Sequence, residues 1–123
     1  MEKNHKHLIL NAKVKNPINC DKECEVWLAN LVKLIDMEIL VPPMAKYCDI
    51  EGNEGVTGVV IITTSHISIH IWPQQPQPYI RMDVYSCKDF DPKSVINYVH
   101  ETMEIVEEEH VVIDRNAKMQ LIA

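Results

Sequence analysis

The chain has no long apolar run, no excess of positive charge and no repeated segment, and each absence excludes a class of protein. No apolar run reaches the ~18 residues that a membrane-spanning helix needs, and the segment from Met1 to His5 contains no signal-peptide core. The net charge of −6 argues against a nucleic-acid or anionic-membrane partner. We therefore expect a cytoplasmic protein.

Cysteine pairs at metal-binding spacing are also missing. The four cysteines form no C-x-x-C pair, and no third ligand stands at a recognisable spacing from the histidines of the central segment. We therefore expect no metal site, and we expect the cysteines to be thiols.

What is present suits one globular domain spanning residues 1–123. Hydrophobic residues make up 46% of the chain and charged residues 24%, which is ordinary for a domain with a genuine core. Apolar residues at alternating or helical spacing predict six strands and two helices. The strands are expected at 7–14, 45–48, 56–64, 66–72, 79–87 and 107–114, and the helices at 21–38 and from Asp91 onward.

This order, β-α-β-β-β-β-α-β, predicts an α+β fold in the form of a two-layer sandwich. Short links imply that neighbouring strands are antiparallel, and the two helices then cover one face of the sheet. The opposite face is left bare and needs a partner.

Polar side chains interrupt the apolar centre of the chain between Thr63 and Pro73. From His66 to Ile71, polar and apolar residues alternate, so two histidines and a serine share one face of a strand while three isoleucines share the other. One interpretation is a half-buried strand whose polar face meets water or a second layer. The other is a functional site on that face.

Three motifs in the middle of the chain together resemble the core of the prokaryotic S-adenosylmethionine decarboxylases. They are Gly55 to Gly58 (GVTG), Ser65 to Pro73 (SHISIHIWP) and Asp83 to Cys87 (DVYSC). In that family the corresponding segments look like GV(S/T)G, ESH(I/L)xIHTWPE and DVYTC, in the same order. The family forms dimers, so the resemblance implies a homodimer in which a second copy covers the bare face, as a four-layer αββα assembly.

The resemblance implies a pyruvoyl-dependent decarboxylase that makes its own cofactor from Ser65. In the family, the motif serine attacks the carbonyl of the residue before it, the resulting ester eliminates, and hydrolysis leaves a pyruvoyl group on the downstream fragment. Cleavage of this chain would give residues 1–64 and 65–123. The pyruvoyl ketone then forms a Schiff base with the substrate amine and takes up the electrons left when carbon dioxide departs.

Further roles follow from the resemblance, position by position. Thr57 stands where a hydroxyl lies beside the intermediate of cleavage, and Thr64 provides the carbonyl that is attacked. His70 matches the histidine that takes the proton needed for elimination, and Cys87 matches the cysteine that reprotonates the substrate Cα. Without the motif, Cys87 would be interpreted as a buried thiol that packs as a small hydrophobe.

The chain departs from the family at nucleoside recognition and beside the scissile bond. Thr64 replaces a glutamate, and Trp72-Pro73-Gln74 replaces Trp-Pro-Glu, whose glutamate is expected to grip both ribose hydroxyls. We expect Trp72 and Gln74 to bind the substrate, with Gln74 bonding more weakly because it has no charge. The segment before Gly55 also has no aromatic residue to stack on adenine.

Three functional interpretations follow. The first is an S-adenosylmethionine decarboxylase of polyamine (spermidine) synthesis, motivated by Ser65, His70 and Cys87. The second keeps the pyruvoyl chemistry but acts on another amino acid, such as ornithine or arginine. The third is an unprocessed relative that binds a ligand or partner without catalysis.

Overall fold

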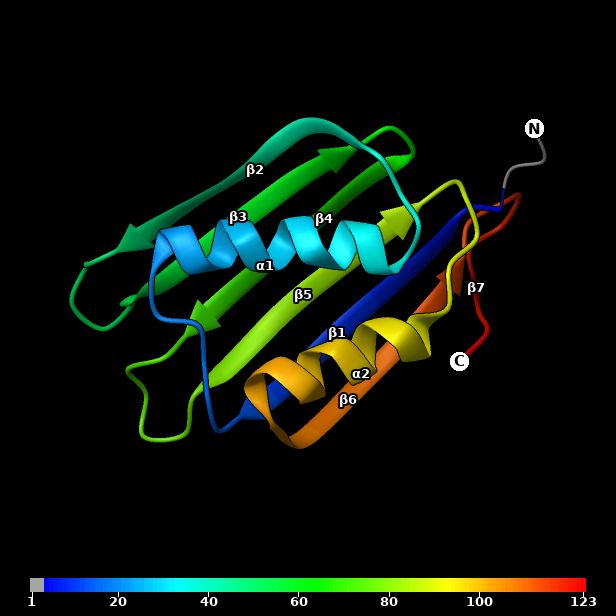
Figure 1. Cartoon of the computed structure of the whole chain (residues 1–123). Coiled ribbons are helices and arrows are strands. Elements are labelled where there is room, and N and C mark those ends of the chain that lie inside the picture. The colour runs from blue at the N-terminus through cyan, green and yellow to red at the C-terminus, as the bar shows by residue number, and fades with distance from the viewer. Residues whose placement is uncertain (1–3) are drawn as a thin grey trace.

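The computed structural model describes residues 4–123, so the first three residues of the expected domain lie outside the described part. The chain forms an antiparallel sheet with two helices (Figure 1). The strands are β1 (Lys6–Val14), β2 (Ile39–Cys48), β3 (Gly55–Ile62), β4 (Ser65–Trp72), β5 (Tyr79–Ser86), β6 (Ile105–Asp114) and β7 (Gln120–Leu121). The helices are α1 (Asp21–Leu34) and α2 (Pro92–Met103).

The strands lie in the order β2-β3-β4-β5-β1-β6-β7, and every neighbouring pair is antiparallel. Both helices lie on the same side of the sheet in Figure 1, α1 over β2, β3 and β4 and α2 over β1 and β6. The predicted α+β sandwich with a bare second face is therefore confirmed.

Each helix begins and packs as its sequence dictates. In α2, the Asp91 carboxylate accepts a hydrogen bond from the backbone N–H of Lys93 at 2.9 Å, and Pro92 occupies the first turn, where its missing N–H costs nothing. The side chains that α1 buries recur at helical spacing and are Cys24, Trp27, Leu28, Leu31 and Val32. The Trp27 indole N–H donates to the Thr102 hydroxyl at 2.8 Å and so joins α1 to α2.

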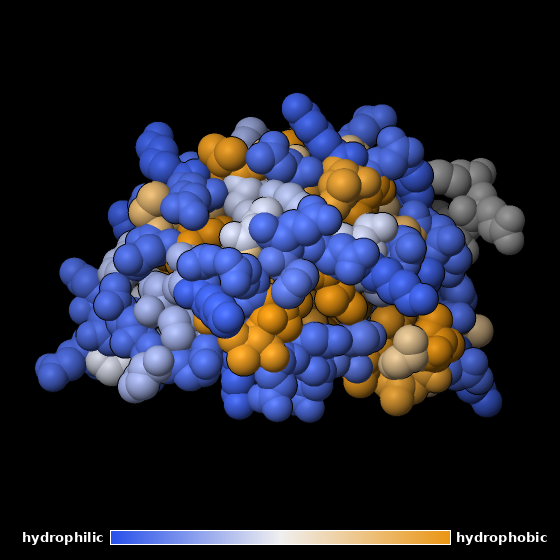
Figure 2. Space-filling view, turned by 60° about the horizontal axis from the view of Figure 1, so that its bottom comes forward, coloured by the Kyte–Doolittle hydropathy of each residue, from blue (hydrophilic) through white to orange (hydrophobic). Residues whose placement is uncertain are grey.

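The core lies between the helices and the inner face of the sheet. In β4 the three isoleucines are fully buried there, while His66, Ser68 and His70 point to the bare face and stay at least partly accessible. At the surface, Figure 2 shows apolar side chains in separate patches among hydrophilic ones. Within residues 4–123, no helix has the length and apolar content needed to cross a membrane.

The element boundaries differ from the expected ones in three places. Helix α1 ends at Leu34 because the chain turns at Asp36, whose φ of 58° is left-handed. Strand β2 continues through Pro42 and Pro43, which an edge strand tolerates because one side of it needs no ladder hydrogen bonds. No strand is expected after residue 114, yet the C-terminal tail adds β7 to the edge of the sheet.

Candidate active site

Ser65 begins β4 in a strained backbone conformation. Its φ is 150°, a value that side-chain-bearing residues rarely adopt. The residue is half-buried and follows a two-residue turn, Thr63-Thr64, that connects β3 to β4. Strain of this kind persists only where neighbouring contacts impose it, and it is concentrated at functional sites.

The residue before Ser65 is held by the end of β5. The carbonyl oxygen of Thr64 accepts a hydrogen bond from the backbone N–H of Cys87 at 2.9 Å, and Ser65 is the register partner of Ser86. Thr63 is fixed as well, because its N–H donates to the carbonyl of Glu38 at 2.9 Å. The structure therefore brings the backbone of Cys87 to Thr64 and Ser65.

Thr57 and His70 meet near the end of β4 that is opposite to Ser65. They are register partners of β3 and β4, and the Thr57 hydroxyl lies 3.1 Å from His70 Nδ1. His70 follows Ser65 by five residues in β4, which at ~3.3 Å per residue puts their Cα atoms about 16 Å apart. A single chain therefore does not bring Thr57 and His70 to the scissile bond, and their roles stay predictions.

The two expected substrate-binding residues also lie at the His70 end. Trp72 stacks between His70 and Tyr79, with ring centroids 6.1 and 4.8 Å away, and its indole N–H donates to Asn53 at 2.9 Å. Gln74 is exposed in the following loop. A shallow pocket of about 80 Å³ opens beside Thr57, His70 and Trp72.

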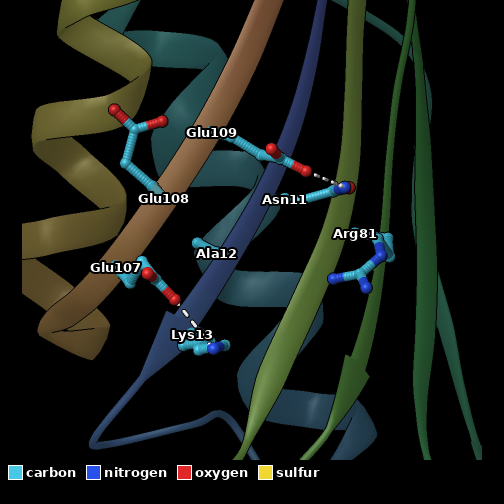
Figure 3. A pocket seen from close by; sticks show the side chains of 7 residues that line it. All are labelled: Asn11, Ala12, Lys13, Arg81, Glu107, Glu108 and Glu109. Atoms are coloured by element: carbon cyan, nitrogen blue, oxygen red, sulfur yellow. Dashed lines mark hydrogen bonds and ion pairs between the residues drawn. The ribbon is translucent and has the colours of Figure 1, made fainter.

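A larger pocket of about 310 Å³ lies on the bare face across β1, β5 and β6 (Figure 3). Its lining residues are Asn11, Ala12, Lys13, Arg81, Glu107, Glu108 and Glu109. Arg81 is the register partner of His70, so the pocket adjoins the His70 end of the site. A hydrogen bond from Lys13, together with the charge of Lys13, lowers the pKa of the exposed Glu107 carboxyl.

A cluster of aromatic and histidine side chains lies on the bare face near Ser65, and the site predicted from the sequence did not include it. His5 Nδ1 lies 2.6 Å from the Tyr85 hydroxyl, His7 Nε2 lies 2.8 Å from Asp83 Oδ1, and the Arg115 guanidinium covers the Tyr85 ring at 4.5 Å. The alternation of side chains along β1 and β5 could have predicted this cluster, because it puts His7, Asp83 and Tyr85 on the same face as His66.

Fold and site together define a class: an α+β protein with a strained serine at the head of its central strand and a cysteine held beside it. The sequence profile of the family described as S-adenosylmethionine decarboxylase matches residues 6–116. The chain belongs to that family.

Curated relatives from bacteria and archaea agree with this family. The chain is 34% identical over 77 residues to an S-adenosylmethionine decarboxylase proenzyme of Clostridium botulinum, covering 62% of this chain and 61% of the relative. The proenzyme of Bacillus velezensis is 31% identical over 103 residues, 74% of this chain and 80% of the relative. The proenzyme of Thermococcus onnurineus is 37% identical over 82 residues, which cover 66% of this chain and 53% of the relative. The chain thus spans less than two thirds of the length of two of these relatives.

Proposed function

We propose that the chain is a pyruvoyl-dependent decarboxylase that cleaves itself at Ser65 and acts on S-adenosylmethionine in polyamine synthesis. The observation that carries this proposal is the strained Ser65 preceded by a carbonyl that Cys87 N–H holds and polarises. The same N–H is in place to stabilise the oxyanion that forms when the carbonyl is attacked. The φ strain, about 1–3 kcal/mol for such conformations, favours breaking bonds at this residue.

The cleavage is an N-to-O shift followed by elimination. The Ser65 hydroxyl oxygen adds to the Thr64 carbonyl carbon, its proton passes to the amide nitrogen as the C–N bond breaks, and an ester replaces the peptide bond. A base then removes the Ser65 Cα proton, the Thr64 carboxylate leaves, and dehydroalanine remains. Tautomerisation, addition of water and loss of ammonia give the pyruvoyl group. The φ torsion of Ser65 includes the Thr64 carbonyl carbon, so its strain is released when the C–N bond breaks in the first step.

The residues around Ser65 fit a pyruvoyl group at this position. The group would cap the downstream fragment at the first residue of β4, which the ladders to β3 and β5 hold in place. When formed, it supplies an electron sink for decarboxylation. Cys87, whose backbone N–H contacts residue 64, would then provide the thiol that returns a proton to the substrate Cα.

We further propose that a second copy completes the site. Thr57 and His70 lie at one end of β4 and Ser65 at the other, so two sheets stacked face to face in opposite directions would bring His70 of one copy to Ser65 of its partner. A closed two-fold arrangement produces two such sites.

The bare face suits this contact. One row of register partners across it reads Met44, Val59, Ser68, Asp83 and Ile9, with apolar residues at both ends and polar ones in the middle. Met44 is exposed and Val59 and Ile9 are only partly buried, and exposed apolar surface of this kind occurs where proteins contact one another. A second copy would cover these apolar ends.

The intact mass of the purified protein tests the proposal. We expect two fragments, residues 1–64 and 65–123, the latter shortened by the conversion of Ser65, and we expect Ser65→Ala to stay whole. The processed protein should release carbon dioxide from S-adenosylmethionine. A single uncut species under all conditions would exclude the function.

Ornithine and arginine serve as competing substrates in the same assay. The relatives reported above all bear the name S-adenosylmethionine decarboxylase proenzyme, which supports neither of the other two amino acids. We expect S-adenosylmethionine to react fastest, and Gln74→Glu to increase that rate because a carboxylate binds two ribose hydroxyls more strongly than an amide.

A further inference from the structure

We propose that Ser86 is a positioning residue for self-cleavage, whose buried hydroxyl clamps Thr64 and so fixes the peptide bond that Ser65 attacks. This inference rests on the proposed function and names a residue that the three motifs do not assign to the reaction. Ser86 lies one residue before Cys87 and pairs in register with Ser65.

Ser86 is an unusual residue of the core. Among residues 4–123 it is the only polar residue in the buried set, with 0% exposure. A buried hydroxyl costs free energy unless hydrogen bonds satisfy it. Isoleucine, methionine and valine fill the neighbouring inward positions of β5, so packing alone does not account for a serine here.

The hydroxyl links three segments in one chain of hydrogen bonds. It accepts from the backbone N–H of Lys88 at 3.0 Å and donates to the Thr64 hydroxyl at 2.9 Å. The Thr64 hydroxyl in turn donates to the Met37 sulfur at 3.3 Å. Each oxygen both accepts and donates, an arrangement in which neighbouring hydrogen bonds strengthen one another.

Thr64 is therefore held at two points from the end of β5. Ser86 holds its side chain and the Cys87 N–H holds its carbonyl oxygen. With residue 64 fixed at both points, Ser65 has little freedom to relax its φ of 150°. The clamp thus maintains the strain and the direction from which the Ser65 hydroxyl meets the carbonyl carbon.

The departure at residue 64 gains an explanation from this contact. The family motif has a glutamate there, whereas this chain has a threonine whose hydroxyl is turned inward to Ser86 and Met37. The short hydroxyl reaches both partners without placing a charge beside the core. The family motif has a threonine at position 86, which also carries a hydroxyl.

The test is the rate of cleavage of newly made precursor, followed by intact mass during cell-free synthesis. We expect Ser86→Ala to slow cleavage by about tenfold or more, because small misplacement of reacting groups costs up to about 100-fold. Ser86→Thr should restore most of the rate. Thr64→Val should slow cleavage to the same extent. The double variant Ser86→Ala/Thr64→Val should be no slower than either single variant, because each substitution removes the same hydrogen bond between the two hydroxyls.

Thr102→Val is the matched control. It removes a hydroxyl that also accepts one hydrogen bond and donates another, from the Trp27 indole of α1 and to the Tyr98 carbonyl within α2. It should therefore lower the melting temperature and leave cleavage unchanged. Cleavage of Ser86→Ala at the wild-type rate would overturn the positioning role while leaving the proposed function intact. A wild-type chain that never cleaves would overturn both. If Thr102→Val slows cleavage as much as Ser86→Ala, the effect of Ser86 is one of stability and the proposal is wrong.

Discussion

At the scale of single residues, Cys87 has two separable parts. Its backbone N–H contacts the Thr64 carbonyl, whereas its thiol is free and half-buried. Under the proposed function, the backbone contact serves cleavage and the thiol serves turnover. Cys24 has no comparable use, because it is fully buried and burial raises the pKa of its thiol to about 12, which makes it a poor proton donor.

We therefore predict that Cys87→Ala cleaves normally but turns over slowly. The backbone N–H survives the substitution, so the precursor should give both fragments in the intact mass. Loss of the proton donor should lower the rate of carbon dioxide release by about 100-fold, a typical contribution of a positioned acid. Cys20→Ala, which alters an exposed thiol just before α1, is the control and should keep full activity. Normal turnover of Cys87→Ala would show that another group supplies the proton.

Of the residues that the motifs single out, Cys87 lies near the scissile bond within one chain and His70 does not. Ser65 and Cys87 meet because β4 and β5 form a hairpin, which the sequence predicted. The separation of Ser65 from His70 was implicit in their five-residue spacing, since a strand is extended. The role of Ser86 could not be predicted from the sequence, because an inward-facing serine indicates no function until its hydrogen-bond partners are known.

At the scale of elements, the packing of α1 on β3 depends on Gly58. A Cβ at this position would lie 2.6 Å from Cys24 Sγ and 3.0 Å from Leu28 Cδ1, closer than packed atoms tolerate. Gly55 is restricted differently, because a Cβ there would collide with the carbonyl oxygen of Ile71. Both glycines of the GVTG motif thus lie where another element packs too closely for a larger residue, α1 at Gly58 and β4 at Gly55.

We expect Gly58→Ala to destabilise the fold by about 1–3 kcal/mol, the usual cost of overpacking a core. Chemical denaturation measures the change as a shift in midpoint. In a Cys24→Ala background the sulfur is gone, so adding Gly58→Ala should cost clearly less than it does in the wild type. Equal costs in the two backgrounds would mean that the helix yields elsewhere and that the contact with Cys24 is unimportant.

Element boundaries were predictable only where a residue sets them locally. Asp91 and Pro92 marked the start of α2 correctly. The end of α1 was expected too late because Ile35 continues the apolar spacing and is buried, although the helix has already ended. Strand β7 comprises two residues, Gln120–Leu121, too few for any periodicity, so only its pairing with β6 reveals it.

At the scale of the whole molecule, the bare sheet face and the divided site lead to the same arrangement. The sequence predicted that face from the order of elements, and the five-residue spacing of Ser65 and His70 in one strand implied that the halves of the site lie far apart. Stacking two copies would cover the face and bring the halves together. The site is then a property of the dimer, and each copy contributes a different half to each site.

This arrangement predicts complementation between two inactive variants. Alone, neither Ser65→Ala nor His70→Ala should cleave. When the two are co-expressed, roughly half of the dimers should be mixed under random pairing, and each mixed dimer pairs Ser65 of the His70→Ala chain with His70 of its partner. The intact mass should therefore show fragments of the His70→Ala chain alone, at about half its total. The double variant Ser65→Ala/His70→Ala provides the control partner, and it should rescue nothing. If His70 served Ser65 of its own chain, the mixture of single variants would stay uncut, and the shared site would be wrong even if the wild-type protein cleaves.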